Sequence, residues 1–182
     1  MNWKKKTVLS VDEIETLFNK MKQSNQIFKD KSFLCSFEKP ETLKDINIVN
    51  LLAFDNKTDI VGHWICLIPN GSDCIVYTCF GIVSYSLFKW LINYGFETIT
   101  FILDQQQNLN SSSCGFYCIR FIYHFFEMPD IKAVYSYFNN YSNFDYITYS
   151  KDSKVLKSRL ENFDVEKYKK IINVYMDLIK QS

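Results

Sequence analysis

The stretch from Cys114 to about Phe126 constrains the fold more strongly than any other part of the chain. Its sequence, CGFYCIRFIYHFF, is apolar on nearly every side of a helix, and only Arg120 and His124 interrupt it. A surface helix needs one apolar stripe, so a helix of this composition must be covered on most sides by other elements. We therefore expect a central helix within an α+β fold.

A small, mostly antiparallel sheet is expected to pack against this helix. Four segments are rich in the β-branched, aromatic and other apolar residues typical of strands. They are residues 46–54, 64–68, 74–79 and 98–103. Asn70-Gly71 separates the second strand from the third, and both central positions of a type I′ hairpin turn need positive φ, which favours this pair. The stretch 27–43 is expected to be irregular.

Helices are expected at both ends of the chain. Ser10 and Glu13 form a capping box that begins a helix ending near Lys22. The segment 83–94 has helical periodicity and is closed by Gly95. Further helices are expected to begin at Pro129, Lys151 and Asp164. The 182 residues fit one domain, with the N-terminal helix in 1–30, the core in 31–128 and C-terminal helices in 129–182.

The composition argues against several functional classes. Apolar residues make up 47% of the chain and aromatic residues 17%, which excludes general disorder. A formal net charge of +1 gives no global attraction to nucleic acid. The N-terminus lacks a secretory pattern and no apolar run approaches ~18 residues, so we expect an intracellular protein that does not enter a membrane. The six cysteines contain no C-x-x-C pair, and neither disulfides nor a metal site are expected.

Cys114 occupies a position that suits a nucleophile. It begins the central helix behind the polar loop 107–113, and a helix N-terminus beside an imidazolium lowers a thiol pKa. His124 follows on the same helix about 15 Å away, at ~1.5 Å per residue, so His63 is the remaining candidate base. Taken singly, a lone Cys or His is more often a core residue. Taken together, with the hydroxyl-rich loop and a glutamine that could donate to an oxyanion, they predict a thiol nucleophile with a base.

Three short motifs resemble those of the adenovirus-type maturation proteases. They are Gly62-His63-Trp64, Tyr77-Thr78-Cys79-Phe80-Gly81 and Gln107-x-x-Asn110-Ser111-x-x-Cys114-Gly115-x-Tyr117-Cys118. They stand in the family's order and near its spacing, over roughly residues 30 to 128. The chain thus resembles adenain and its relatives in Maverick or polinton elements and virophages, which share a clan with the SUMO and ubiquitin-like deconjugating proteases. The resemblance implies a papain-like arrangement with the nucleophile on the central helix.

The resemblance also implies a role for each matching residue. Cys114 would be the nucleophile and His63 the general base that later protonates the leaving amine. Gln107 would form the oxyanion hole with the Cys114 backbone N–H, and its seven-residue offset is preferred over those of Gln105 and Gln106, which stay open. The residues expected beside the substrate are Gly115, Ser113 and Trp64, whose ring is expected mainly to pack.

Thr78 departs from the family pattern at the third catalytic position. Where the family has Asp or Glu two residues before Phe-Gly, this chain has a hydroxyl, which can orient an imidazole but adds no charge. The Cys–His ion pair should therefore be less favoured than in the family. One interpretation is an active enzyme with a varied third position, and the other is a weakened or non-catalytic copy of the fold.

The resemblance implies an endopeptidase that cleaves viral capsid or core precursors after small residues such as glycine, in the infected cell and in the virion. A deconjugating isopeptidase for a ubiquitin-like protein would use the same residues and is the alternative activity. No cofactor is required by the chemistry, although the resemblance implies that a viral peptide or DNA could stimulate the enzyme. The near-zero net charge argues mildly against dependence on DNA.

Overall fold

The computed structural model describes seven stretches of the chain. They are residues 8–36, 48–54, 63–79, 85–102, 112–127, 146–150 and 157–159. Within them the elements follow the order α1 (Val11–Ser24), the short 3-10 helix η2 (Gln26–Phe28), β1 (Ser32–Ser36), β2 (Ile48–Phe54), β3 (His63–Asn70), β4 (Asp73–Tyr77), α2 (Tyr85–Tyr94), β5 (Thr98–Ile102), α3 (Cys114–Glu127), β6 (Tyr146–Ser150) and β7 (Lys157–Arg159). Helices and strands are combined in one unit, which confirms the α+β class.

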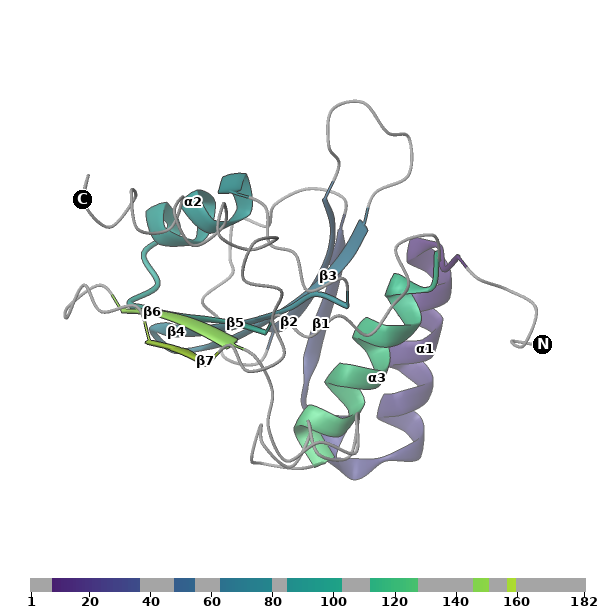
Figure 1. Ribbon diagram of the computed structural model, residues 1–182. Coiled ribbons are helices and arrows are strands. Elements are labelled where there is room, and N and C mark those ends of the chain that lie inside the picture. The colour runs from purple at the N-terminus through teal and green to yellow at the C-terminus, as the bar shows by residue number, and fades with distance from the viewer. Residues whose placement is uncertain are drawn as a thin grey trace.

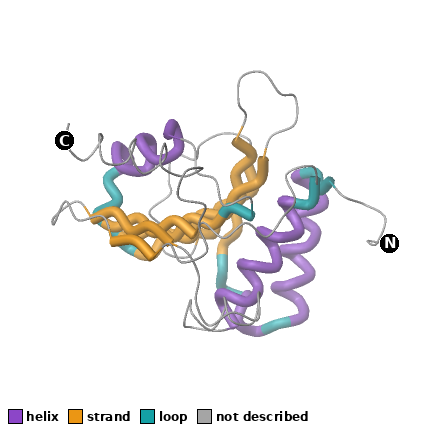
Figure 2. The backbone as a smooth tube through the Cα atoms, in the orientation of Figure 1, coloured by secondary structure: helices purple, strands orange, loops and turns teal. Residues whose placement is uncertain are grey.

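The strands form a single mixed sheet in the order β1-β2-β3-β4-β5-β6-β7. The β1–β2 and β4–β5 pairs are parallel, and the remaining neighbours are antiparallel. α2 forms the crossover between β4 and β5, as a parallel pair requires. Figures 1 and 2 show α1 and α3 on one side of the sheet and α2 on the other.

The central strands are buried on both faces, so their side chains divide between two cores. On one face Cys66, Tyr77 and Ile102 are aligned across β3, β4 and β5, and all three belong to the core that includes α1 and α3. Because successive strand residues point to opposite faces, Leu67 and Val76 lie on the other face, where both are fully buried. Such doubly buried strands read as continuous apolar runs, which is why β3 is apolar from Trp64 to Ile68.

α1 and α3 run side by side in the same direction (Figure 1). Near their N-terminal ends, Leu9 before α1 lies close to Gly115 of α3, where a Cβ would stand 3.2 Å from Leu9 Cβ. The Trp64 indole N–H of β3 donates to the Leu9 carbonyl at 3.1 Å. Their C-terminal ends meet where Asn25 Nδ2 donates to Glu127 Oε1 at 3.3 Å. The middle of α3 packs against the sheet, where the rings of Phe121 in α3 and Tyr77 in β4 stack with centroids 4.2 Å apart.

Several sequence predictions are confirmed. The capping box at Ser10 and Glu13 is present, with Ser10 as N-cap of α1. α2 occupies the predicted 83–94 segment, and Gly95 follows it with φ +99°. The Asn-Gly hairpin also forms, but Asn70 pairs with Asp73, so the two turn residues are Gly71, with φ +60°, and Ser72. The turn therefore lies one residue later than predicted.

Three strands correct the prediction. β1 lies within the stretch 27–43 that was expected to be irregular. It is held as a strand by its parallel pairing with β2, which its local sequence does not predict. β6 and β7 lie in the C-terminal part that was predicted to be wholly helical. β6 reads YITYS, whose tyrosines and β-branched residues favour a strand. The helices predicted at Pro129 and Asp164 lie outside the described residues.

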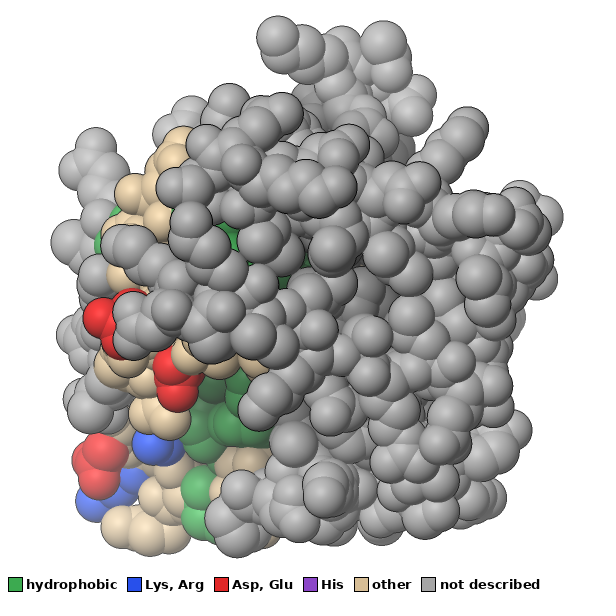
Figure 3. All heavy atoms as spheres, turned by 60° about the vertical axis from the view of Figure 1, so that its left-hand side comes forward, with side chains coloured by type: hydrophobic (Ala, Val, Ile, Leu, Met, Phe, Trp, Pro, Cys, Tyr) green, Lys and Arg blue, Asp and Glu red, His purple; other side chains and the backbone are tan. Residues whose placement is uncertain are grey.

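The described surface carries charges of both signs. Among the described residues visible in Figure 3, acidic and basic side chains lie around a small apolar area. In the part of the chain that is described, no helix combines the length and apolarity needed to cross a membrane.

Candidate active site

Cys114 is the first residue of α3, and the preceding residue starts the helical hydrogen bonding. The Ser113 carbonyl accepts from the backbone N–H of Tyr117 at 3.3 Å and from that of Phe116 at 3.0 Å. The N–H groups of the first helical turn have no carbonyl partners within the helix, so they point toward whatever lies in front of it. The Cys114 side chain is 7% exposed, more than any other cysteine of the central core. It therefore combines a helix N-terminus with limited solvent access.

His63 and Thr78 are brought together by the register of β3 and β4. Cys66 pairs with Tyr77, so continuing the ladder by one residue on β4 places Thr78 opposite Ile65. His63 and Thr78 are then diagonal neighbours on one face. His63 Nε2 lies 3.2 Å from Thr78 Oγ1, a hydrogen bond in which either group can donate, depending on the imidazole tautomer. Thr78 is 1% exposed, so its hydroxyl contacts the imidazole away from bulk water.

The backbone between His63 and Trp64 connects this pair to the thiol. The backbone of Trp64 is close enough to the Cys114 thiol to lower its pKa. The sulfur therefore lies near the start of β3. Four residues along α3, the Cys118 thiol donates to the Trp64 carbonyl at 3.3 Å. The backbone of Trp64 thus helps to hold one face of α3 against β3.

Burial decides the protonation of the thiol. Burial raises the pKa of Cys114 above its ordinary value, and hydrogen bonds from the N–H groups of Trp64, Gly115 and Cys114 itself act in the opposite direction without cancelling it. The helix N-terminus was expected to lower this pKa. The N–H groups act in the expected direction, but loss of hydration of the thiolate is the larger effect.

Burial has the corresponding effect on the base. It lowers the pKa of His63 to about 4, because the charged imidazolium loses its hydration and a threonine hydroxyl supplies no compensating charge. Near neutral pH both groups are therefore uncharged in the resting protein. The weaker ion pair expected from Thr78 is consistent with both shifts.

Trp64 and Gly115 have clear packing roles. Trp64 is 4% exposed and its indole N–H is used by Leu9. A Cβ added to Gly115 would lie 3.2 Å from Leu9 Cβ and 3.3 Å from Trp64 Cδ1, so a glycine allows α3 to approach α1 and β3 closely. Their predicted contacts with a substrate stay predictions. Gln105, Gln106 and Gln107 lie outside the described residues.

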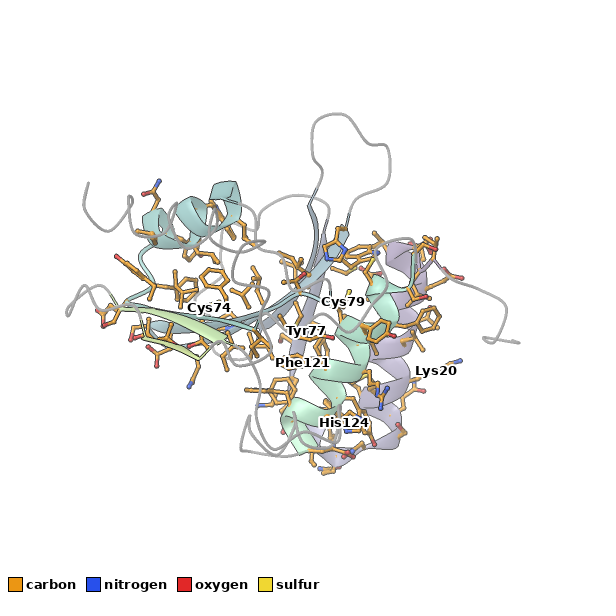
Figure 4. All side chains as sticks on the ribbon, in the orientation of Figure 1. Lys20, Cys74, Tyr77, Cys79, Phe121 and His124 are labelled. Carbon is orange, nitrogen blue, oxygen red and sulfur yellow. The ribbon has the colours of Figure 1, made fainter. Side chains whose placement is uncertain are left out.

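Two other thiols lie near the nucleophile. Cys79 and Cys118 are both fully buried and within electrostatic range of Cys114. Burial raises the pKa of each, so both are protonated, inert thiols in the resting protein. His124 is remote from them: Figure 4 shows it near the opposite end of α3 from Cys79. Among the described residues, no group of His, Cys, Asp and Glu could hold a metal ion.

Leu9 is a site residue that sequence reasoning missed. It lies directly before the N-cap of α1, is 2% exposed, and contacts the indole that follows His63. Leu9 and Ile14 stand at the two positions of a hydrophobic staple, and both are buried in the same core. The hydrophobic staple could be recognised in the sequence. It predicts how the chain leads into α1, but it does not predict the contact between Leu9 and Trp64 of β3.

No family model, curated protein or solved structure matches this chain.

Proposed function

We propose that this protein is a cysteine hydrolase that cleaves peptide bonds, with Cys114 as nucleophile and His63 as general base. The observation that carries the proposal is the position of the first turns of α3 beside Trp64, the residue that follows the imidazole: the Cys118 thiol donates to the Trp64 carbonyl at 3.3 Å, and the Trp64 backbone lowers the pKa of Cys114. Thr78 orients the same imidazole from the neighbouring strand. These two observations support the assignment of a thiol, a base and an orienting group, which is the set of groups that nucleophilic catalysis requires.

Because both groups are neutral at rest, catalysis would begin with proton transfer. The His63 imidazole takes the thiol proton as the sulfur attacks the scissile carbonyl carbon, and the carbonyl oxygen becomes an oxyanion. The backbone N–H of Cys114, which lies at the N-terminus of α3, would donate to that oxyanion, with Gln107 as the proposed second donor. The imidazolium then protonates the leaving amine. Water, deprotonated by His63, hydrolyses the thioester and restores the thiol.

The proposed substrates follow from the resemblance to adenovirus-type proteases. That family implies cleavage of viral capsid or core precursors after small residues such as glycine, with the enzyme present in the infected cell and packaged in the virion. A deconjugating isopeptidase for a ubiquitin-like protein would require the same thiol and base. A panel of ubiquitin-like substrates and precursor-derived peptides separates the two activities.

One observation favours a second candidate, a virion protein that keeps the protease fold with little or no catalysis. The pKa of the thiol is raised and that of the imidazole is lowered, so the reactive ion pair is absent at rest. Thr78, in place of an acid, offers no charge to restore it. The two candidates make opposite predictions about reactivity at Cys114.

A peptide probe ending in glycyl-glycine vinyl sulfone tests the proposal. A functional site should give a covalent adduct at Cys114 in the intact protein, located by peptide mapping. His63→Ala should abolish the adduct, whereas His124→Ala, the matched control on the far part of α3, should not change it. Equal labelling of the protein and its His63→Ala variant would indicate an inert scaffold with an accidentally reachable thiol.

A further inference from the structure

Two cysteines of α3 lie on the same face of the helix. Cys118 follows Cys114 by four residues, and residues at this spacing are neighbours on a helical surface. Helical side chains lean toward the N-terminus of their helix, so the Cys118 thiol lies over the turn that carries Cys114. Cys118 is fully buried, whereas Cys114 is 7% exposed. The face that carries the proposed nucleophile thus continues into the core through a second thiol.

The Cys118 thiol is hydrogen-bonded to the first part of β3. It donates to the Trp64 carbonyl at 3.3 Å, in a buried contact between residues 54 positions apart in the sequence. Burial raises the pKa of Cys118, so the thiol keeps the proton that it donates. The backbone of Trp64 also lowers the pKa of the Cys114 thiol. One residue of β3 therefore acts on both thiols.

Trp64 is held in place by elements other than α3. Its backbone pairs with Ala53 of β2, and its indole N–H donates to the Leu9 carbonyl at 3.1 Å. Its side chain is 4% exposed. Trp64 therefore provides a fixed point to which the first turns of α3 can be attached.

A second contact holds α3 further along its length. The rings of Phe121 and Tyr77 stack three residues beyond Cys118, at the middle of the helix (Figure 4). This stack joins α3 to β4, whereas the Cys118 hydrogen bond joins the part of the helix next to Cys114 to β3. A change at Cys118 should therefore affect the position of Cys114 more than that of the rest of α3.

Helix geometry argues against a disulfide between the two thiols. The Cβ atoms of residues four apart on a helix are about 5–6 Å from each other. A disulfide requires a Cβ–Cβ distance of about 3.5–4.5 Å, so the first turn of α3 would have to unwind to form one. The structure thus supports a role for Cys118 through its hydrogen bond to Trp64 rather than through oxidation.

We propose that Cys118 is a positioning residue for the Cys114 sulfur. Its thiol, bonded to the Trp64 carbonyl, holds the first turn of α3 against β3 and so fixes the sulfur beside the Trp64 backbone. A thiol is a weak donor, so the hydrogen bond directs the helix more than it stabilises the protein. The catalytic importance of this position rests on the proposed function, but the position itself can be measured without turnover.

Alkylation of Cys114 by iodoacetamide near pH 8 tests the proposal. The intact protein is exposed to brief pulses of the reagent, and the rate at Cys114 is read by peptide mapping. Cys118→Ala removes the donor, so the Trp64 backbone stabilises the Cys114 thiolate less and the pKa of Cys114 rises. Because the thiolate is the reactive form, the rate should fall about threefold. A core that was merely loosened would act in the opposite direction, since a more exposed thiol reacts faster.

Two further substitutions separate the donor from the volume of the side chain. Cys118→Ser is the rescue variant, because it also lacks the sulfur but keeps a hydroxyl that can donate. Its Cys114 should react at the wild-type rate. Cys118→Val fills the space without a donor and should be slowed as Cys118→Ala is, so it gives the same test if the alanine variant does not fold.

Cys66→Ala is the matched control. It removes another fully buried thiol of the same core, from β3, and should not slow the alkylation of Cys114. Urea titrations of all the variants compare their losses of stability. A slowing that appeared in Cys66→Ala as well would be a general effect of lost packing, and would overturn the proposal.

An alkylation rate in Cys118→Ala equal to or above that of the wild type would also overturn it, as would equal slowing in Cys118→Ala and Cys118→Ser. The hydrolase and the positioning role can fail separately. If the vinyl sulfone probe gives no adduct that depends on His63 while the iodoacetamide series gives the expected rates, the hydrolase is rejected and the positioning role stands. If the adduct forms but Cys118→Ala is alkylated at the wild-type rate, only the positioning role is rejected.

Discussion

At the residue scale, the state of His63 follows from what surrounds it. A buried imidazole keeps a near-normal pKa only when a carboxylate offsets the cost of its charge. Here the ring contacts the neutral hydroxyl of Thr78, and the pKa falls to about 4. The imidazole therefore remains an unprotonated base well below neutral pH, and its charged form is destabilised in the folded protein.

This depression makes the stability of the protein depend on pH. In the unfolded chain His63 titrates near 6.5, whereas in the folded chain it titrates near 4. The unfolded state binds the proton more readily, so the contribution to stability is complete above pH 6.5 and is lost as the pH falls toward 4. The loss amounts to about 3 kcal/mol of unfolding free energy by pH 4. Urea titrations at pH 7.5 and pH 4 measure it.

His63→Gln provides the comparison, because it removes the titrating group. The pKa of His124 is also lowered, chiefly by burial, and acts in the same direction in both proteins, so it cancels in the difference. The wild type should lose more stability than the variant between the two pH values. An equal loss would show that His63 titrates normally in the folded state.

Thr78→Asp should replace the neutral contact between His63 and Thr78 with an ion pair between the imidazolium and a carboxylate. A carboxylate beside the imidazole raises the pKa of His63, stabilises the imidazolium that forms during attack, and should raise kcat/KM at least about tenfold. The acid limb of the pH–rate profile should move upward from about pH 4. Thr78→Asn is the matched control, since it has similar size and polarity but no charge. If neither variant changes the rate or the profile, this position does not limit catalysis.

At the element scale, α3 owes its position to contacts with β3 at one end and with β4 at its middle. The Trp64 indole of β3 bonds to the Leu9 carbonyl just before α1. Because Gly115 has no side chain, the first turn of α3 can pack closely against Leu9 and Trp64. Tyr77 stacks on Phe121 two turns further along. The placement of the Cys114 sulfur therefore depends on side chains that take no part in its chemistry.

Trp64→Phe isolates one of these contacts. It keeps an aromatic ring but removes the indole N–H, leaving the buried Leu9 carbonyl without this donor, at a cost of about 1–3 kcal/mol. Probe labelling at Cys114 should slow as well, because the first turn of α3 is held less firmly. Trp90→Phe, on α2 across the sheet, is the control that should leave labelling unchanged. If labelling slowed in both variants, the cause would be a general loss of protein stability rather than the loss of the Trp64–Leu9 hydrogen bond.

The same elements show what sequence alone could predict. The capping box, the Asn-Gly hairpin and the apolar α3 are encoded by local patterns, and all three are present. β1 and β7 are formed by pairing with a neighbour rather than by a local pattern, and β7 is only three residues long. At the site, sequence identified His63 and Thr78, whose side chains lie within hydrogen-bond distance, and Cys114, whose pKa is influenced by the backbone of Trp64. Their catalytic roles stay predictions. The raised pKa of Cys114 was not predictable, because burial depends on what α1 and the sheet cover.

At the scale of the whole molecule, one sheet separates two cores. Cys118 is buried with α1 and α3 on one side, while Cys74 is buried in β4, where its side chain points to the face that Leu67 and Val76 share. Both cores are built on β3, β4 and β5, so neither can persist once these strands separate. The molecule should accordingly unfold in one cooperative step, as small single domains usually do.

The buried cysteines report on this cooperativity directly. In a urea series, brief pulses of iodoacetamide followed by peptide mapping should label Cys74 and Cys118 with the same midpoint, because exposure of either requires loss of the shared strands. Cys35, which is only partly buried in β1, should react at lower urea. A midpoint for Cys74 well below that of Cys118 would show that the α2 side opens by itself. The sheet would then join two units of different stability, with Cys114 belonging to the one built on α3.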